Sequence, residues 1–344
     1  MIKIKCAASF FLSCFIFSFP LTAQTPKSIK TIIVDAGHGG KDFGAHGGYE
    51  GGLGTYEKNV TLAISNKVVA ELRRQLPDVK IVPTRTTDIY QPPPEKADIA
   101  NTNKGDLFVC IHADAVALKT GRRQISTRVE TRYKYTYTGK GKKKKKIPHP
   151  YSVVVPVYEY YKIGSQRSGT SIWLFAAHKT SAKIEALIKN EEDIQIESSS
   201  DSTYNNIDFS TPEYRMMAKV HADRYQKKSI KLAAMVDEEV STTSRNALGI
   251  NQRQKGIWVL QATNMPAILI ETGFITNYDD ERYLNSEKGQ QELAECIARA
   301  VKRYKEEMEN PKINGINNSD TKKEERKVLE EATGKIVKTG QKIF

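Results

Sequence analysis

The stretch Thr31-Ile-Ile-Val-Asp-Ala-Gly-His-Gly-Gly40 decides the fold, because a short apolar run passes directly into a glycine-rich turn that carries a histidine. The apolar run has the length of a buried strand. Apolar residues then recur every four positions between Glu57 and Leu76, which predicts an amphipathic helix. A strand, a turn and a helix in this order are typical of an α/β domain with a mostly parallel sheet.

The same alternation continues along the chain and predicts one sheet flanked by helices. The 344 residues, of which 39% are apolar, suffice for one large domain or two small ones. A short helix is expected from Glu95 to Asn101, and a long one from Gly289 to about Glu309. Further apolar runs predict strands at Val79–Val82, Leu107–Ile111, Ile172–Phe175, Ile257–Leu260 and Ala267–Ile270.

Two insertions and a tail interrupt this pattern. Residues 119–168 are rich in basic residues and tyrosine, and their Thr/Tyr alternation predicts a β-hairpin or a long loop. Residues 178–240 are expected to be helical at both ends around a polar centre. Residues 310–344 carry alternating charge and almost no aromatic residue, so we expect a disordered or loosely helical tail. The main domain therefore spans residues 24–309.

The first 23 residues have the pattern of an export signal. Lys3 and Lys5 precede an apolar run from Ala7 to Phe19, and Leu21-Thr-Ala23 forms a small-residue cleavage site. A membrane anchor is the alternative, but the apolar run is shorter than the roughly 20 residues that span a bilayer. We therefore expect an exported protein, in the periplasm, with no stable membrane span.

The net charge of +13 is concentrated in one place. Between Lys119 and Lys146 there are twelve Lys and Arg and a single acid, Glu130, so this stretch accounts for eleven of the net charges. Two lysines in the signal account for the rest, and the remaining chain is neutral. A nucleic-acid binder needs a basic face on the fold itself, so we expect no nucleic acid as partner. The basic stretch is expected either to attract phosphate and carboxylate groups of envelope polymers or to be a solvated loop without a particular function.

Polar side chains follow several of the predicted strands. His38 comes after the first strand, Glu57 opens the first helix, His112 follows Leu107–Ile111, and Glu271 follows Ala267–Ile270. The carboxyl ends of parallel strands face one crevice, so these four side chains are expected to meet. Two histidines and a glutamate are an attested ligand set for catalytic Zn²⁺, and the remaining carboxylate can act as general base.

Cysteine contributes little to such a site. The chain has four cysteines and none of them forms a C-x-x-C pair, so the metal ligands must be mainly histidine and carboxylate. Two cysteines lie in the signal. We expect Cys110, in a strand, and Cys296, on a helix, to be packing residues rather than a disulfide.

Several motifs in register resemble the zinc-dependent N-acetylmuramoyl-L-alanine amidases of the type-3 family, the cell-wall amidases of daughter-cell separation. The resemblance spans about Ile32 to Tyr304, and Cys110 departs from it because the family commonly has Ser there. The matching runs are Asp35-Ala-Gly-His-Gly-Gly40, Tyr56-Glu-Lys-Asn59, Thr84-Arg85, Ala100-Asn101, Leu107-Phe-Val-Cys-Ile-His-Ala-Asp114 and Met265-Pro-Ala-Ile-Leu-Ile-Glu-Thr-Gly-Phe-Ile-Thr-Asn277.

The resemblance implies a phosphorylase/hydrolase-like α/β fold and zinc held by His38, Glu57 and His112, with Glu271 as the catalytic carboxylate. The implied substrate is peptidoglycan, cleaved at the amide between the lactyl group of N-acetylmuramic acid and the first L-Ala of the stem peptide. Two other classes remain open: another exported zinc peptidase acting on wall peptides, since this ligand set is shared chemistry, and a non-catalytic wall-binding module.

Two further sets of residues are candidates for supporting roles. Arg85 and Asn101 are expected either to brace the site by hydrogen bonding or to be purely structural. Regulated members of the family carry a helix that covers the zinc groove until an activator protein displaces it. The matching position here lies within Ser181–Arg224, where Glu191 or Glu192 is the candidate inhibitory ligand, with a solvated acidic helix end as the alternative.

Overall fold

We describe the protein from a computed structural model, which defines residues 28–175, 183–184, 212–252 and 257–310. The expected signal at residues 1–23, the expected tail apart from its first residue, Asn310, and the candidate ligands Glu191 and Glu192 lie outside the described residues. Among the described helices, none is long and apolar enough to cross a membrane.

The core is a six-stranded, mostly parallel sheet, as predicted. Its strand order is β2-β1-β3-β8-β6-β7, and the β6–β8 pair is antiparallel while the other neighbouring pairs run parallel. The strands are β1 (Thr31–Ala36), β2 (Lys80–Pro83), β3 (Leu107–Asp114), β6 (Thr170–Leu174), β7 (Ala247–Gln252) and β8 (Ala267–Phe274).

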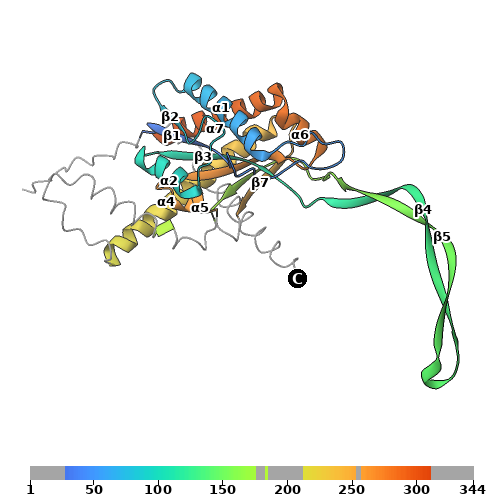
Figure 1. Cartoon of the computed structure of the whole chain (residues 1–344). Helices are drawn as coiled ribbons and strands as arrows, with labels where there is room; N and C mark the ends of the chain where they lie inside the picture. Colours follow the sequence, from blue (N-terminus) through green and yellow to red (C-terminus); the bar gives the residue numbers. More distant parts are fainter. Residues whose placement is uncertain (1–27, 176–182, 185–211, 253–256, 311–344) are drawn as a thin grey trace, which may run out of the picture.

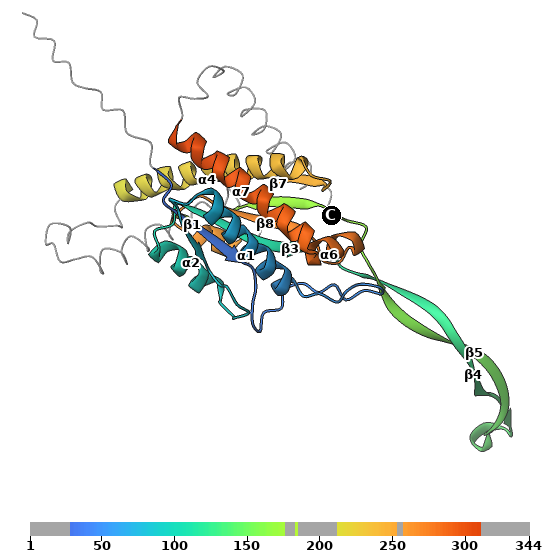
Figure 2. The same cartoon turned by 90° about the horizontal axis from the view of Figure 1, so that it is seen from above.

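Helices cover both faces of this sheet (Figure 1, Figure 2). On one side lie α1 (Glu57–Gln75), α4 (Pro212–Ser241) and α7 (Glu287–Glu309), and α6 (Tyr278–Asn285) precedes α7. The shorter α2 (Pro93–Thr102) and α5 (Trp258–Ala262) pack on the other side.

The alternation of side chains along β1 explains why both faces need cover. Ile32 and Val34 join the apolar cluster beneath α1, α4 and α7, whereas Ile33 points into the cluster formed with α2 and α5. All three side chains are fully buried. A strand with no polar face of this kind is expected at the centre of a parallel sheet.

One predicted strand is wrong and one observed strand was not predicted. Ile257–Leu260 was expected to be a strand, but Trp258–Ala262 forms helix α5, whose Val259 and Leu260 fill the smaller apolar cluster. A four-residue apolar run fits a buried strand and a short buried helix equally well. The missed strand is β7, at the edge of the sheet, which contains Gly249 at φ +77° and lacks a clear apolar pattern.

The first insertion forms a long β-hairpin rather than a loop. Its strands, β4 (Lys119–Thr138) and β5 (Lys145–Ile163), pair antiparallel and are joined by a short 3₁₀ turn at Gly141–Lys143. The hairpin projects away from the sheet and its helices (Figure 1, Figure 2). Of the second insertion, the structure describes residues 183–184 and the end that forms α4, which is helical as expected.

Candidate metal centre

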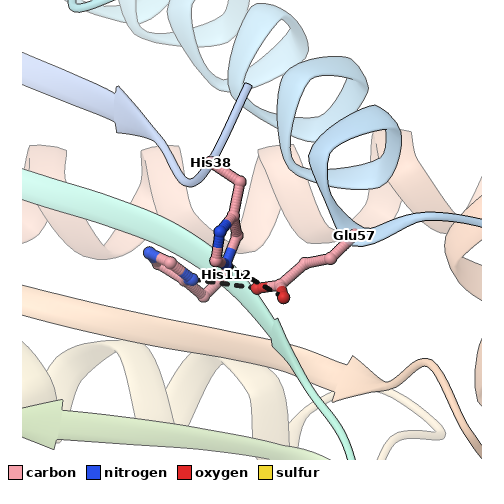
Figure 3. Close-up of side chains that lie close together, drawn as sticks. All are labelled: His38, Glu57 and His112. Carbon is pink, nitrogen blue, oxygen red and sulfur yellow. Dashed lines mark hydrogen bonds and ion pairs between the residues drawn. The ribbon is translucent and has the colours of Figure 1, made fainter. Parts of the chain in front are cut away.

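Three of the predicted site residues converge where the strands end. His38 follows β1, His112 lies near the end of β3, and Glu57 is the first residue of α1 (Figure 3). One ligand atom from each lies within 4.8 Å of the others. The Glu57 carboxylate contacts both rings, with its Oε2 3.0 Å from His38 Nε2 and its Oε1 2.9 Å from His112 Nδ1.

Two glycines leave the space that these side chains occupy. A Cβ atom on Gly37 would lie 2.6 Å from the ring of His112, and one on Gly44, whose φ is +66°, would lie 2.6 Å from Glu57 Oε2. Any larger residue at either position would push a ligand out of place. The glycine-rich turn after β1 therefore shapes the site as well as turning the chain.

Neighbouring groups hold the ligands in orientation. Asp42 Oδ2 lies 2.9 Å from His38 Nδ1, so the other ring nitrogen, Nε2, is left to face Glu57. The backbone N–H groups of Ala45 and Ala113 donate to the two oxygens of Glu57 at 2.8 and 3.0 Å. Outer partners of this kind fix ring orientation and ligand basicity at metal sites.

The charges in the cluster shift the pKa values of two of its members. Burial alone would raise the pKa of Glu57, but hydrogen bonds and charge from His112 and His38 outweigh it and hold that pKa well below its usual range. Burial alone would lower the pKa of His38, yet Glu57 and Asp42 raise it to about 9. An anionic carboxylate between two imidazoles suits a divalent cation, and two histidines with a glutamate are an attested zinc set.

Glu271 lies in the same cavity as these three residues. The cavity measures about 390 Å³, and Glu271 on β8 lies beside His112 on β3 in the parallel ladder. The Glu271 side chain is buried, with 6% of its surface exposed. The arrangement thus combines three convergent side chains that could hold a metal ion with a separate buried carboxylate, which is suited to hydrolysis.

Comparison with known proteins decides the family. A sequence profile described as N-acetylmuramoyl-L-alanine amidase matches residues 32–303. The chain belongs to this amidase family. The resemblance drawn from its motifs is therefore confirmed.

Individual relatives agree with the family match. The chain is 29% identical over 279 residues to amidase AmiC of Escherichia coli O6:H1, covering 79% of this chain and 52% of AmiC. It is 25% identical over 291 residues to the probable amidase AmiB of Haemophilus influenzae, covering 84% and 54%. The chain thus spans about half the length of these relatives. A crystal structure of the amidase from Clostridium difficile 630 aligns with 22% identity over 81% of this chain and 97% of that one, with a TM-score of 0.46.

The supporting candidates occupy different places in the amidase domain. Arg85 is buried and donates to the backbone oxygens of Ala36, Gly37 and Lys58 at 3.1, 2.8 and 3.0 Å, so it braces the turn that carries His38. Asn101 lies apart from the metal ligands. It bonds the backbone on either side of Thr263 and ties α2 to the chain that leads into β8.

The two cysteines within the described residues are free and buried, as expected. Cys110 donates to Asp35 Oδ2 at 2.9 Å, and Asp35 also accepts from Thr84 and pairs with Lys96. Burial alone would raise the pKa of Asp35, but Lys96 and these donors keep it below its usual range. Serine, common in the family at this position, could donate the same bond, so the departure leaves the site intact.

Sequence reasoning missed two residues of the site. Asp42 supports His38 from four positions along the same turn, and that spacing was the available signal. Trp258 lines the cavity with about half of its surface exposed. Its apolar run predicts a strand, in which a tryptophan is an ordinary core residue, so the sequence gives no signal for a role in the cavity.

Proposed function

We propose that this chain is a zinc-dependent amidase that cleaves peptidoglycan between the lactyl group of N-acetylmuramic acid and the L-Ala of the stem peptide, in cell separation. One observation carries the proposal: His38, Glu57 and His112 converge in a cavity that also contains the Glu271 carboxylate, in a chain of the amidase family. Cavities of this kind, with few convergent polar groups, are the usual sites of reaction.

Each residue then has a defined task. His38, Glu57 and His112 would hold Zn²⁺, which acts as a Lewis acid toward the amide carbonyl and lowers the pKa of water. Glu271 takes the proton from the attacking water and delivers it to the departing amine of L-Ala. Asp42 holds the His38 ring in orientation from behind.

Digestion of purified peptidoglycan tests the reaction. The protein lacking residues 1–23 should release intact stem peptides whose free amino terminus is L-Ala, and mass analysis of the products identifies them. Another exported zinc peptidase would instead release fragments cut within the stem peptide. A non-catalytic wall-binding module would sediment with the wall and release nothing. The three hypotheses therefore predict different outcomes of the digestion.

We further propose that the protein is exported to the periplasm by residues 1–23 and that residues 24–309 form the amidase domain, followed by a charged tail. The leader pattern and the nature of the substrate support export. Peptidoglycan is the expected partner, together with an activator protein that relieves inhibition.

Autoinhibition by the segment Ser181–Arg224 completes the proposal, with Glu191 or Glu192 competing with water at the metal site. Its support is the position of Lys183, which is buried and donates to the Leu260 carbonyl of α5 at 3.0 Å. Helix α5 also carries Trp258 in the wall of the cavity. Glu191 follows Lys183 by eight residues, a span of at most about 28 Å along the chain.

Replacing Glu191 and Glu192 by Ala should raise basal wall hydrolysis by one to two orders of magnitude. An open-to-closed ratio of about 1:99 limits the gain to roughly a hundredfold, which an activator would otherwise supply through preference for the open form. Dye release from labelled peptidoglycan measures the rate, and Glu306 and Glu307 changed to Ala provide an acidic control pair on α7. Unchanged basal activity in a folded, zinc-loaded variant would contradict autoinhibition by these residues.

A further inference from the structure

The β4–β5 hairpin is a long, exposed arm. Its strands contain 20 and 19 residues, and at about 3.3 Å per residue they span roughly 65 Å. Within the part of the chain that the structure describes, these strands pair only with each other. An isolated two-stranded ribbon is marginally stable in water, and a third strand increases its stability. A partner strand would therefore stabilise the arm.

The base of the arm is firmly attached beside the catalytic cavity. The chain runs from Ala115, which lines the cavity, to the start of β4 at Lys119. Arg123 forms an ion pair with Glu50 of the domain at 2.6 Å, and the Glu50 N–H donates to the Lys162 carbonyl at 2.9 Å. These contacts tie the base of the arm to the domain beside the cavity.

Charge divides the arm into two halves. Near the base, Arg123 is paired with Glu50 and Glu159, and Arg128 with Glu130. Between Thr131 and Tyr158 there are eight Lys and Arg and no Asp or Glu. Tyrosine rings hold some of these lysines on the ribbon, with Lys146 Nζ 3.7 Å from the Tyr135 centroid and Lys134 Nζ 5.4 Å from that of Tyr151.

The two outer edges of the arm differ. Pro148, Pro150 and Pro156 lie opposite Tyr135, Tyr133 and Thr127. Proline cannot donate a ladder hydrogen bond. These three residue pairs are therefore non-hydrogen-bonded pairs of the antiparallel ladder, in which the backbone N–H and C=O groups of both residues point away from the partner strand. Three donors are therefore missing from the β5 edge, whereas β4 has no proline and offers its outward N–H and C=O groups from Thr127 to Tyr137. Prolines of this kind block edge pairing, so β4 is the open edge.

The two faces of the arm next to this edge also differ. On one face, Val129 and its partner Val154 are 69% and 64% exposed, and Tyr133, Tyr135 and Tyr137 continue the exposed row toward the tip. The other face of β4 carries Arg128, Arg132 and Lys134 alternating with these residues, together with Glu130. A strand beside β4 would meet an apolar row on one side and a basic row on the other.

We propose that the arm is a docking element on which an acidic, extended segment of a partner protein adds as a third strand to the β4 edge between Thr127 and Tyr137. Alternation in that segment places apolar side chains over Val129 and the tyrosines and carboxylates against the basic row. The like charge of a second arm disfavours pairing with another copy of this chain. The open backbone edge favours a polypeptide over an anionic polymer, which has no strand to pair. This docking is independent of the activity proposed above.

A synthetic peptide of about eleven residues alternating Glu and Val tests the proposal on the purified protein. Fluorescence anisotropy should show binding that weakens with added salt. Thr131→Pro removes one outward N–H donor and should weaken binding roughly tenfold. Ser152→Pro is the matched control, because Ser152 is the cross-strand partner of Thr131 and lies on the edge that is already blocked. It should leave binding unchanged.

Peptide modification tests backbone pairing without altering the protein. N-methylation of alternate amides in the peptide removes its ladder donors at the same charge, and it should weaken binding to the wild-type protein by a similar factor. Equal affinity of both peptides, or of both proline variants, would overturn the proposal. Absence of peptide binding would also overturn it, and lysine-dependent binding to purified sacculi would then assign the arm to an anionic polymer instead.

Discussion

Glu271→Gln and Glu271→Ala are each expected to lower the rate of wall hydrolysis by about two to three orders of magnitude and to retain bound zinc. The expected loss is in the range for removal of a general acid and base from an active site. Zinc should be retained because the proposed ligand set, His38, Glu57 and His112, does not include Glu271. Metal analysis and stem-peptide release, measured on the same preparation, separate the two effects.

Cys110→Ser is the matched control for this pair of variants. Cys110 is fully buried on β3, the strand beside the one that carries Glu271, and its thiol donates to Asp35. Serine retains the donor, so the variant should keep both zinc and activity. A fully active Glu271→Ala protein would remove Glu271 from the mechanism, and loss of zinc in Glu271→Gln would make it a ligand instead of a proton carrier.

The parts of the fold predicted correctly are those where one local pattern has one structural solution. Apolar recurrence at every fourth position predicts the amphipathic helix α1, and the apolar run at Leu107–Ile111, rich in β-branched residues, favours an interior strand. Ile257–Leu260 has no such unique solution, since its structure depends on what packs against it. The edge strand β7 needs little apolar surface, so its sequence carries little signal.

The predicted convergence of site residues rests on topology rather than on local pattern. Parallel strands place their carboxyl ends at one edge, which brings His38 and His112 together although 73 residues separate them. The contacts around His38 and His112 depend on side-chain geometry, which the pattern of apolar residues in a strand does not predict. The bond from Asp42 to His38 and the exposure of Trp258 in the cavity are of this kind.

His38→Ala and His112→Ala are expected to lose bound zinc and, with it, wall hydrolysis. Each change removes one of the three proposed protein ligands. The loss of zinc affinity should therefore exceed the roughly 10- to 100-fold loss that is typical when a residue hydrogen-bonded to a metal ligand is replaced. His46→Ala is the matched control, because His46 lies in the same glycine-rich stretch but stacks on Tyr56. It should retain zinc. A His112→Ala protein with one tightly bound zinc would contradict the proposed ligand set.

Proton release gives an independent test of the same site. In the protein stripped of metal, Glu57 and Asp42 raise the pKa of His38 to about 9, so its ring is protonated at neutral pH. A metal ligand must be the neutral imidazole, so zinc uptake should expel that proton, and zinc affinity should rise about tenfold per pH unit up to a pH near that pKa. Titration calorimetry in buffers of different ionisation enthalpy counts the protons. Asp42→Asn removes one of the two carboxylates that raise this pKa, and it should therefore shift the rise in affinity to lower pH. Zinc affinity that is independent of pH between about 7 and 8.5 would contradict a raised pKa of His38 in the metal-free protein.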